Sequence, residues 1–153
     1  MNYKVVITEV TNYGATLYCV AGWDLDQERM IRPEPETANA NDESSRFWGS
    51  DNAGAGQSLA LGNVVTFKGD DPPKSFAYPH ATEDRIVSSA FEVVGYMPPQ
   101  KMANALSHAL SKSVASAFQG LVHQQNGKLY VVGGTQGPSL SAVQLNSSQL
   151  RLC

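Results

Sequence analysis

The chain has 153 residues, a formal net charge of −3 at neutral pH and a hydrophobic content of 42%. This length predicts one domain, or one domain and the start of another, with enough chain for a core that needs no disulfide or structural metal. The acidic net charge differs from the strongly basic charge that is usual for nucleic-acid binding proteins. No apolar run approaches the roughly 20 residues that cross a bilayer.

Charge is distributed unevenly along the chain. Residues 1–75 hold 6 Lys and Arg against 11 Asp and Glu, a net of −5, whereas residues 76–153 hold 5 against 3, a net of +2. An anionic ligand would therefore have to be met by a local cluster of cations, because the field of the whole chain does not attract it.

The N-terminus resembles a mature strand and not a targeting segment. Residues 1–10 contain neither a long apolar region nor a small-residue cleavage site, which predicts a cytoplasmic protein. The cysteines agree with this prediction: Cys19 falls in an expected core strand and Cys153 is the last residue, so neither indicates a disulfide framework.

The first third of the chain predicts a β-hairpin and a third, short strand. Residues 3–10 are rich in β-branched side chains and 15–22 are largely apolar, with a turn at 11–14 where Asn and Gly tolerate positive φ. An acidic turn at 24–28 leads to a short strand over 29–32. Pro33 ends that strand because proline cannot donate to a β-ladder.

Residues 33–60 are rich in Pro, Gly, Ser and Asn and predict a long loop, which inside a domain is usually functional or mobile. The sequence Arg46-Phe47-Trp48 stands in its middle. Two interpretations remain open: these residues anchor the loop to the rest of the fold, or they offer a flat surface to a ligand.

The remaining chain predicts one helix among further strands. Residues 62–68 form a strand, a polar connector follows around 78–84, and 85–88 form another short strand. Apolar residues every four positions then predict a helix over 99–119, begun by Pro99 and ended by Gly120; they are Met102, Leu106, Leu110, Val114 and Phe118.

After the helix the pattern returns to strands at 128–132 and 139–145. A further strand begins near Ser148, and the chain ends within it. We therefore expect one barrel domain over residues 1–147, with 148–153 beginning a following strand or a second domain.

This order predicts a mainly β protein. One helix between the third and fourth of five strands indicates an OB-like Greek-key barrel, whose ligand surface comprises strands 2 and 3 with the loops expected at 11–14 and 133–138. The alternative is an α+β domain with an antiparallel sheet and one covering helix.

The segment Cys19-Val20-Ala21-Gly22, an acidic turn and then Ile31-Arg32-Pro33 resembles the opening of the dual OB domain family of prokaryotic proteins. Members of that family have two OB-like barrels in tandem, and this chain resembles the first barrel and the start of the second. The resemblance implies an OB-like barrel and a nucleic-acid binding role without a known reaction. Met30 stands where such sequences often have an aromatic residue.

Cations and aromatic side chains of the first half are the candidate ligand contacts. The Arg32 guanidinium can bind a phosphate through paired donors, or it can form a salt bridge with Glu34, Glu36 or an acid of the first strand. Single-stranded nucleic acid requires cations for phosphates and aromatic faces for bases. The residues expected to bind it are Arg29, Arg32, Arg46, Trp48, Lys68, Tyr78 and His80.

Other constellations favour structural interpretations. Asp24, Asp26 and Glu28 alternate, but the spacing is typical of a solvated turn. The three histidines lack metal-ligand spacing, and a buried strand cysteine such as Cys19 is usually an apolar side chain. We therefore expect no catalytic residue, no metal and no cofactor.

The sequence predicts a noncatalytic OB-like module that binds single-stranded nucleic acid or RNA. The alternative is a protein-interaction or assembly domain, in which the barrel face or the 33–60 loop pairs with another chain. No membrane contact is expected, and the oligomeric state stays open.

Overall fold

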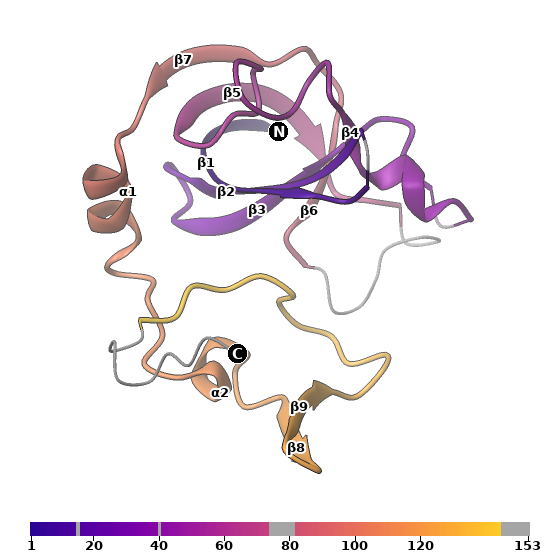
Figure 1. The fold of residues 1–153 in the computed structure, drawn as a ribbon, viewed down its shortest axis with the longest axis vertical. Coiled ribbons are helices and arrows are strands. Elements are labelled where there is room, and N and C mark those ends of the chain that lie inside the picture. The colour runs from indigo at the N-terminus through magenta and orange to yellow at the C-terminus, as the bar shows by residue number, and fades with distance from the viewer. Residues whose placement is uncertain (15, 40, 74–81, 145–153) are drawn as a thin grey trace.

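The computed structural model describes residues 1–14, 16–39, 41–73 and 82–144 (Figure 1). The protein is mainly β, with 44% strand and 11% helix. Five strands form a ring-like sheet. They are β1 (Asn2–Asn12), β2 (Leu17–Asp24), β3 (Arg29–Glu34), β5 (Asn63–Asp70) and β6 (Asp84–Val87).

The ring runs in the order β1-β2-β3-β6-β5 and closes where β5 pairs with β1. The β3–β6 pair is parallel, and the other neighbours are antiparallel. β1 closes the ring because it has a partner on each edge: Val5 lies opposite Asp24 of β2 and opposite Val65 of β5. The strands expected at 3–10, 15–22, 29–32, 62–68 and 85–88 are confirmed, with small shifts of their ends.

Alternation along β1 divides the apolar residues between two clusters. Tyr3, Val5 and Ile7 are buried in the main core, which fills the ring together with residues of β2, β3 and β5. Val6 faces the other way and packs with Trp23 and Val64 in a second cluster. The helix α1 (Pro99–Leu106) covers that second cluster with Met102 and Leu106 (Figure 1).

The segment 35–62 between β3 and β5 is attached to the ring. It contains the short 3-10 helix η1 (Glu43–Arg46) and the two-residue strand β4 (Trp48–Gly49), which pairs with β2. Trp48 is buried, donates from Nε1 to the Pro33 carbonyl at 2.8 Å and packs edge-on against Phe91. Phe47 stacks on Tyr13 with ring centroids 4.0 Å apart. The anchoring interpretation of this segment is therefore confirmed.

The helix expected over 99–119 is two helices, α1 and α2 (Val114–Ala117). Ser113 separates them: its backbone is extended, with φ −156° and ψ 161°, and its hydroxyl accepts from the Ser116 amide to begin a new helix. Both helices follow the last strand of the ring, so the expected position between the third and fourth of its strands is wrong. The four-residue repeat predicted the apolar face but not this cap.

The last third also differs from expectation. The strand expected at 128–132 is β9 (Lys128–Val131), but it pairs with β8 (Val122–Gln125) in a separate hairpin that lies apart from the ring (Figure 1). Residues 139–144 form no strand beyond a bridge from Val143 to Ser111. The start of a further strand expected at 148–153 lies outside the described residues.

One strand was missed. β7 (Glu92–Tyr96) pairs with β5 at the edge of the sheet. No strand is expected there from the sequence, and Pro98-Pro99 follows directly.

Candidate functional site

Arg32 and Arg46 meet in a cluster of carboxylates. Arg32 donates from Nε to Asp84 Oδ1 at 2.7 Å, and Arg46 bonds to the other oxygen of Asp84 and to Glu34. Glu83 lies 3.6 Å from Arg32, between its Oε1 and the arginine Nη2. Of the partners expected for Arg32, which were Glu34, Glu36 or an acid of the first strand, Glu34 lies 4.0 Å from its Nε, but the main partner is Asp84.

Burial strengthens the interactions between the charged groups of this cluster, because water screens them little. Asp84 is fully buried and Glu34 nearly so. Burial lowers the pKa of Arg32, but the charge of Asp84 and its hydrogen bond outweigh this and raise the pKa above its ordinary value. Burial raises the pKa of Glu34 above its ordinary value, although the Arg46 hydrogen bond opposes the shift.

The cluster joins segments that are distant in sequence. Arg32 and Glu34 come from β3, Arg46 from η1, and Asp84 from β6. Ser139 extends it: its hydroxyl accepts from Arg32 Nη2 at 2.7 Å, and its amide donates to Glu83 at 2.9 Å. Because both guanidiniums already hold carboxylates, the cluster attaches η1 and residue 139 to the ring and leaves Arg32 and Arg46 poorly placed to bind a phosphate.

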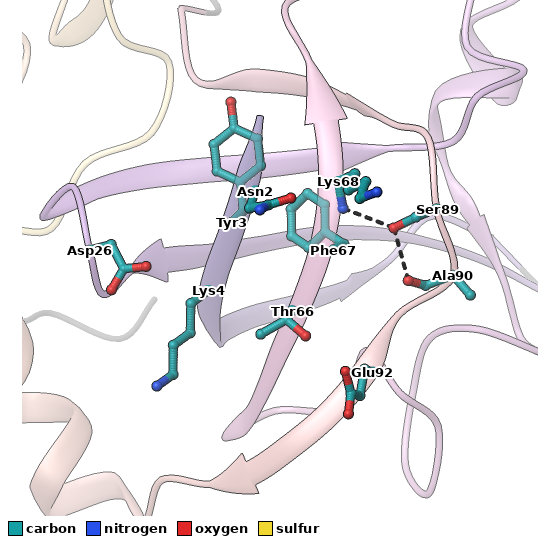
Figure 2. A pocket seen from close by; sticks show the side chains of 10 residues that line it. All are labelled: Asn2, Tyr3, Lys4, Asp26, Thr66, Phe67, Lys68, Ser89, Ala90 and Glu92. Carbon is teal, nitrogen blue, oxygen red and sulfur yellow. Dashed lines mark hydrogen bonds between the residues drawn. The ribbon is translucent and has the colours of Figure 1, made fainter.

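Lys68 lies in a different place, a pocket of about 430 Å³ with mixed polar and apolar lining over β1 and β5 (Figure 2). Lys4 lines the same pocket, but Figure 2 shows the two lysine side chains extending in different directions. The carboxylates of Asp26 and Glu92 line it as well. Opposed charges and divergent ammonium groups do not favour a phosphate at this position.

Arg29 lies in a third place, a cavity of about 420 Å³. Trp23, Arg29 and Met30 form its wall on β2 and β3. The rest of the lining comes mainly from the segment 109–119, which follows α1 and includes α2, and from the segment 138–142. Its remaining lining residues are Thr82, Glu83, Ala109, Ser111, Ser116, Ala117, Gln119, Pro138, Leu140, Ser141 and Ala142. We call this cavity the Arg29 pocket.

Arg29 has no partner among the residues that the structure describes. Its Nε is buried without a hydrogen-bond partner, and no ion pair engages its guanidinium there. Asp24 lies opposite Arg29 in the β2–β3 register; its Oδ1 accepts from the amides of Asp26 and Gln27, and its Oδ2 is buried without a hydrogen-bond partner among the described residues. A buried donor without a partner calls for a water or a ligand.

The seven predicted contacts are thus separated. Arg32 and Arg46 share one cluster, Lys68 and Arg29 line different pockets, and Trp48 is buried as an anchor. Tyr78 and His80 lie outside the described residues. Two further features are not evident from the sequence: the lining residues at 138–142, and the carboxylate of Asp84, whose role depends on the parallel β3–β6 pairing.

Nothing in the described residues supplies an evident reaction centre. No group of three or more His, Cys, Asp or Glu in that part of the chain could hold a metal ion. Burial raises the pKa of the Cys19 thiol, although the charge of Arg32 opposes this, so the thiol is not activated as a nucleophile. None of the described helices has the length and apolar character needed to cross a membrane.

Comparisons with protein-family models, with curated proteins and with solved structures find no match.

Proposed function

We propose that the chain is a noncatalytic OB-like module that binds single-stranded nucleic acid in the Arg29 pocket. The observation that carries this proposal is the Arg29 guanidinium, which lines a cavity and whose buried Nε has no hydrogen-bond partner among the described residues. A guanidinium that forms no ion pair can donate two hydrogen bonds to a phosphate, although the Glu83 carboxylate also lines this pocket.

The position of the pocket supports the proposal. Numbered along the chain, the strands of the ring run first, second, third, fifth, fourth and back to the first. OB-fold proteins bind oligonucleotides on the face of strands 2 and 3, which correspond here to β2 and β3. Trp23, Arg29 and Met30 of the pocket come from those two strands. The resemblance of Cys19–Pro33 to the dual OB domain family agrees with this assignment.

The charges of the chain predict that it binds a nucleic-acid strand weakly and contacts few of its phosphates. The chain is acidic overall, and Arg32 and Arg46 are engaged by carboxylates. Each neutralised phosphate of a single strand contributes a slope of about −0.7 to the dependence of log K on log salt concentration. One arginine therefore predicts a slope near that value and a modest affinity.

Fluorescence anisotropy with labelled single strands of about 12 nucleotides tests the proposal, since OB folds cover roughly 4–16 nucleotides. Arg29→Ala should weaken binding roughly 10- to 100-fold, the cost of losing hydrogen bonds to a charged group. Lys101→Ala, which removes an exposed cation of α1 outside the pocket, is the matched control and should bind like the wild type. Binding of the wild type that Arg29→Ala leaves unchanged would refute the proposal.

A second candidate function is protein interaction, favoured by β7. Val93, Val94 and Tyr96 are 48%, 47% and 64% exposed, although they belong to a strand. Within the described residues, β7 pairs only with β5, so its other edge is available to an added strand. Light scattering of the wild type and of Val94→Lys tests this function: association that the lysine abolishes would support it.

A further inference from the structure

We infer that residues 111–144 form a flap on one side of the Arg29 pocket, and that Ser139 is the latch that holds this flap on the ring. The flap contains α2, the β8–β9 hairpin and the segment 138–142, and it lies below the ring in Figure 1. The latch is a property of the folded chain, whereas the role of the flap in ligand binding rests on the proposed function.

The flap is not packed into the hydrophobic core. Neither of the two hydrophobic clusters of the described chain contains a residue of 111–144: the main core ends with Phe91, and the second cluster ends with Ala109. Ala117 is the one buried hydrophobic residue in the described part of the flap, and it lines the Arg29 pocket. The flap therefore lacks most of the apolar burial that stabilises a docked element.

Hydrogen bonds attach the flap to the ring at one residue. Among the residues that the structure describes, Ser139 is the only member of 111–144 that hydrogen-bonds to an earlier part of the chain. Its amide donates to Glu83 at 2.9 Å, and its hydroxyl donates to the same carboxylate and accepts from Arg32 Nη2 at 2.7 Å. Both partners are charged, and hydrogen bonds to charged groups are stronger than those between neutral groups. The Ser139 hydroxyl thus provides much of the attachment.

Contacts within the flap make it a single unit. The Ser111 amide donates to the Ala142 carbonyl at 2.9 Å, and the Ser111 carbonyl accepts from the Gln144 amide at 3.1 Å, so the two ends of the flap are joined. Its elements are small, a helix of four residues and a two-stranded hairpin, and such elements are marginally stable alone. We expect the flap to open as one unit of low stability, with the chain at 107–110 as its hinge.

The Arg29 pocket lies between the ring and this flap. Trp23, Arg29 and Met30 line it from the ring, whereas Ala117 and Leu140 are among the residues that line it from the flap. The flap side of the lining is therefore in place only while the flap is docked. A ligand that contacts both sides binds the docked state and stabilises it.

Hydrogen exchange of the free protein tests the latch. Amides of 111–144 should exchange faster than those of β1 and β5 in the wild type. Ser139→Ala should accelerate exchange of the flap by about 10- to 100-fold, the effect of losing hydrogen bonds to charged groups, and leave β1 and β5 unchanged. Ser141→Ala is the matched control, because Ser141 belongs to the same segment and makes no hydrogen bond to the ring. Its flap should exchange at the wild-type rate.

Acrylamide quenching of Trp23 detects a flap that leaves the ring without unfolding. Trp23 is 5% exposed and lines the pocket, so its fluorescence should be quenched more strongly in Ser139→Ala than in Ser141→Ala. Flap exchange and Trp23 quenching that are both the same in these two variants would overturn the inference.

A single strand of about 12 nucleotides connects the flap to the proposed function. At about ten times its dissociation constant, a strand that binds only the docked state should slow flap exchange about 10-fold. Binding that leaves flap exchange unchanged would retain the proposed function and reject the part of the flap in it. Faster flap exchange in Ser139→Ala, without any binding of the strand, would retain the latch and reject the proposed function.

Discussion

Arg32 and Asp84 lie side by side in the sheet and are hydrogen-bonded through their side chains. They are register partners in the parallel β3–β6 pair, and Arg32 Nε lies 2.7 Å from Asp84 Oδ1. Asp84 also bonds to Arg46, which reaches it from η1. One fully buried carboxylate thus holds two guanidiniums from separate segments.

Asp84→Ala should strongly lower the free energy of unfolding. The substitution leaves two partly buried guanidiniums with one fewer carboxylate, and breaking a buried ion pair by removing one partner costs about 3–5 kcal/mol. Urea unfolding followed by circular dichroism measures the loss. Asp70→Ala is the control, since Asp70 is 73% exposed, and its removal should change little. Equal losses in the two variants would mean that the buried network does not hold the fold together.

Glu34 gives the stability a pH dependence. Burial raises the pKa of the folded Glu34 above its ordinary value, which the unfolded chain retains. Between these two pKa values the folded state holds more protons, so the free energy of unfolding falls as pH rises through that window. The difference in unfolding free energy between wild type and Glu34→Gln isolates this effect from the other carboxylates. It should decrease with rising pH above about 4.5 and then level off; an increase would contradict the burial argument.

Trp48 should stabilise the folded protein through its indole N–H as well as through the packing of its ring. Trp48→Phe keeps an aromatic ring beside Phe91 but leaves the buried Pro33 carbonyl without its donor, at a cost of about 1–3 kcal/mol. Thermal unfolding measures the loss. Tyr13→Phe is the comparison, because it removes an exposed hydroxyl while keeping the ring stacked on Phe47, and its melting temperature should stay near that of the wild type.

Two strand glycines should respond oppositely to alanine. A Cβ at Gly22 would lie 2.6 Å from the backbone oxygen of Val6 and 2.4 Å from Val5 Cγ1, so Gly22→Ala forces the β1–β2 pair apart. A Cβ at Gly95 would meet nothing within 4 Å. Gly95→Ala should therefore be neutral or stabilise by about 0.4–1 kcal/mol, whereas Gly22→Ala should lower the unfolding midpoint clearly. Similar midpoints for the two variants would show that β1 and β2 do not approach so closely.

Elements whose residues form a clear local pattern could be predicted from the sequence. The strands of the ring have alternating or continuous apolar residues bounded by Pro, Gly and Asn, so residues 3–10 and 62–68 were recognisable without tertiary information. The Asn126-Gly127 turn was recognisable for the same reason, and both residues adopt positive φ. The break at Ser113 was not, because its cap competes with an apolar repeat that continues through it.

The candidate site depends on contacts between distant segments, which no local sequence pattern predicts. Arg29 and Arg32 look alike in sequence, three positions apart on one short strand. Only the fold shows that Arg32 meets Asp84 across a parallel pair, whereas Arg29 Nε has no hydrogen-bond partner among the described residues although Asp24 lies opposite it. The partner of Arg32 comes from a segment more than 50 positions away, and no pattern within the short strand reveals it.

The pairing of β1 with both β2 and β5 has a consequence for synthesis on the ribosome. β1 and β2 can form their hairpin early, but the second edge of β1 waits for Asn63–Asp70, and β3 waits for Asp84–Val87. Such non-local closure is slow, and until it occurs the nascent chain carries open strand edges rich in valine. Expression of this protein should therefore benefit from slow translation or from chaperones that cover unpaired β-strands.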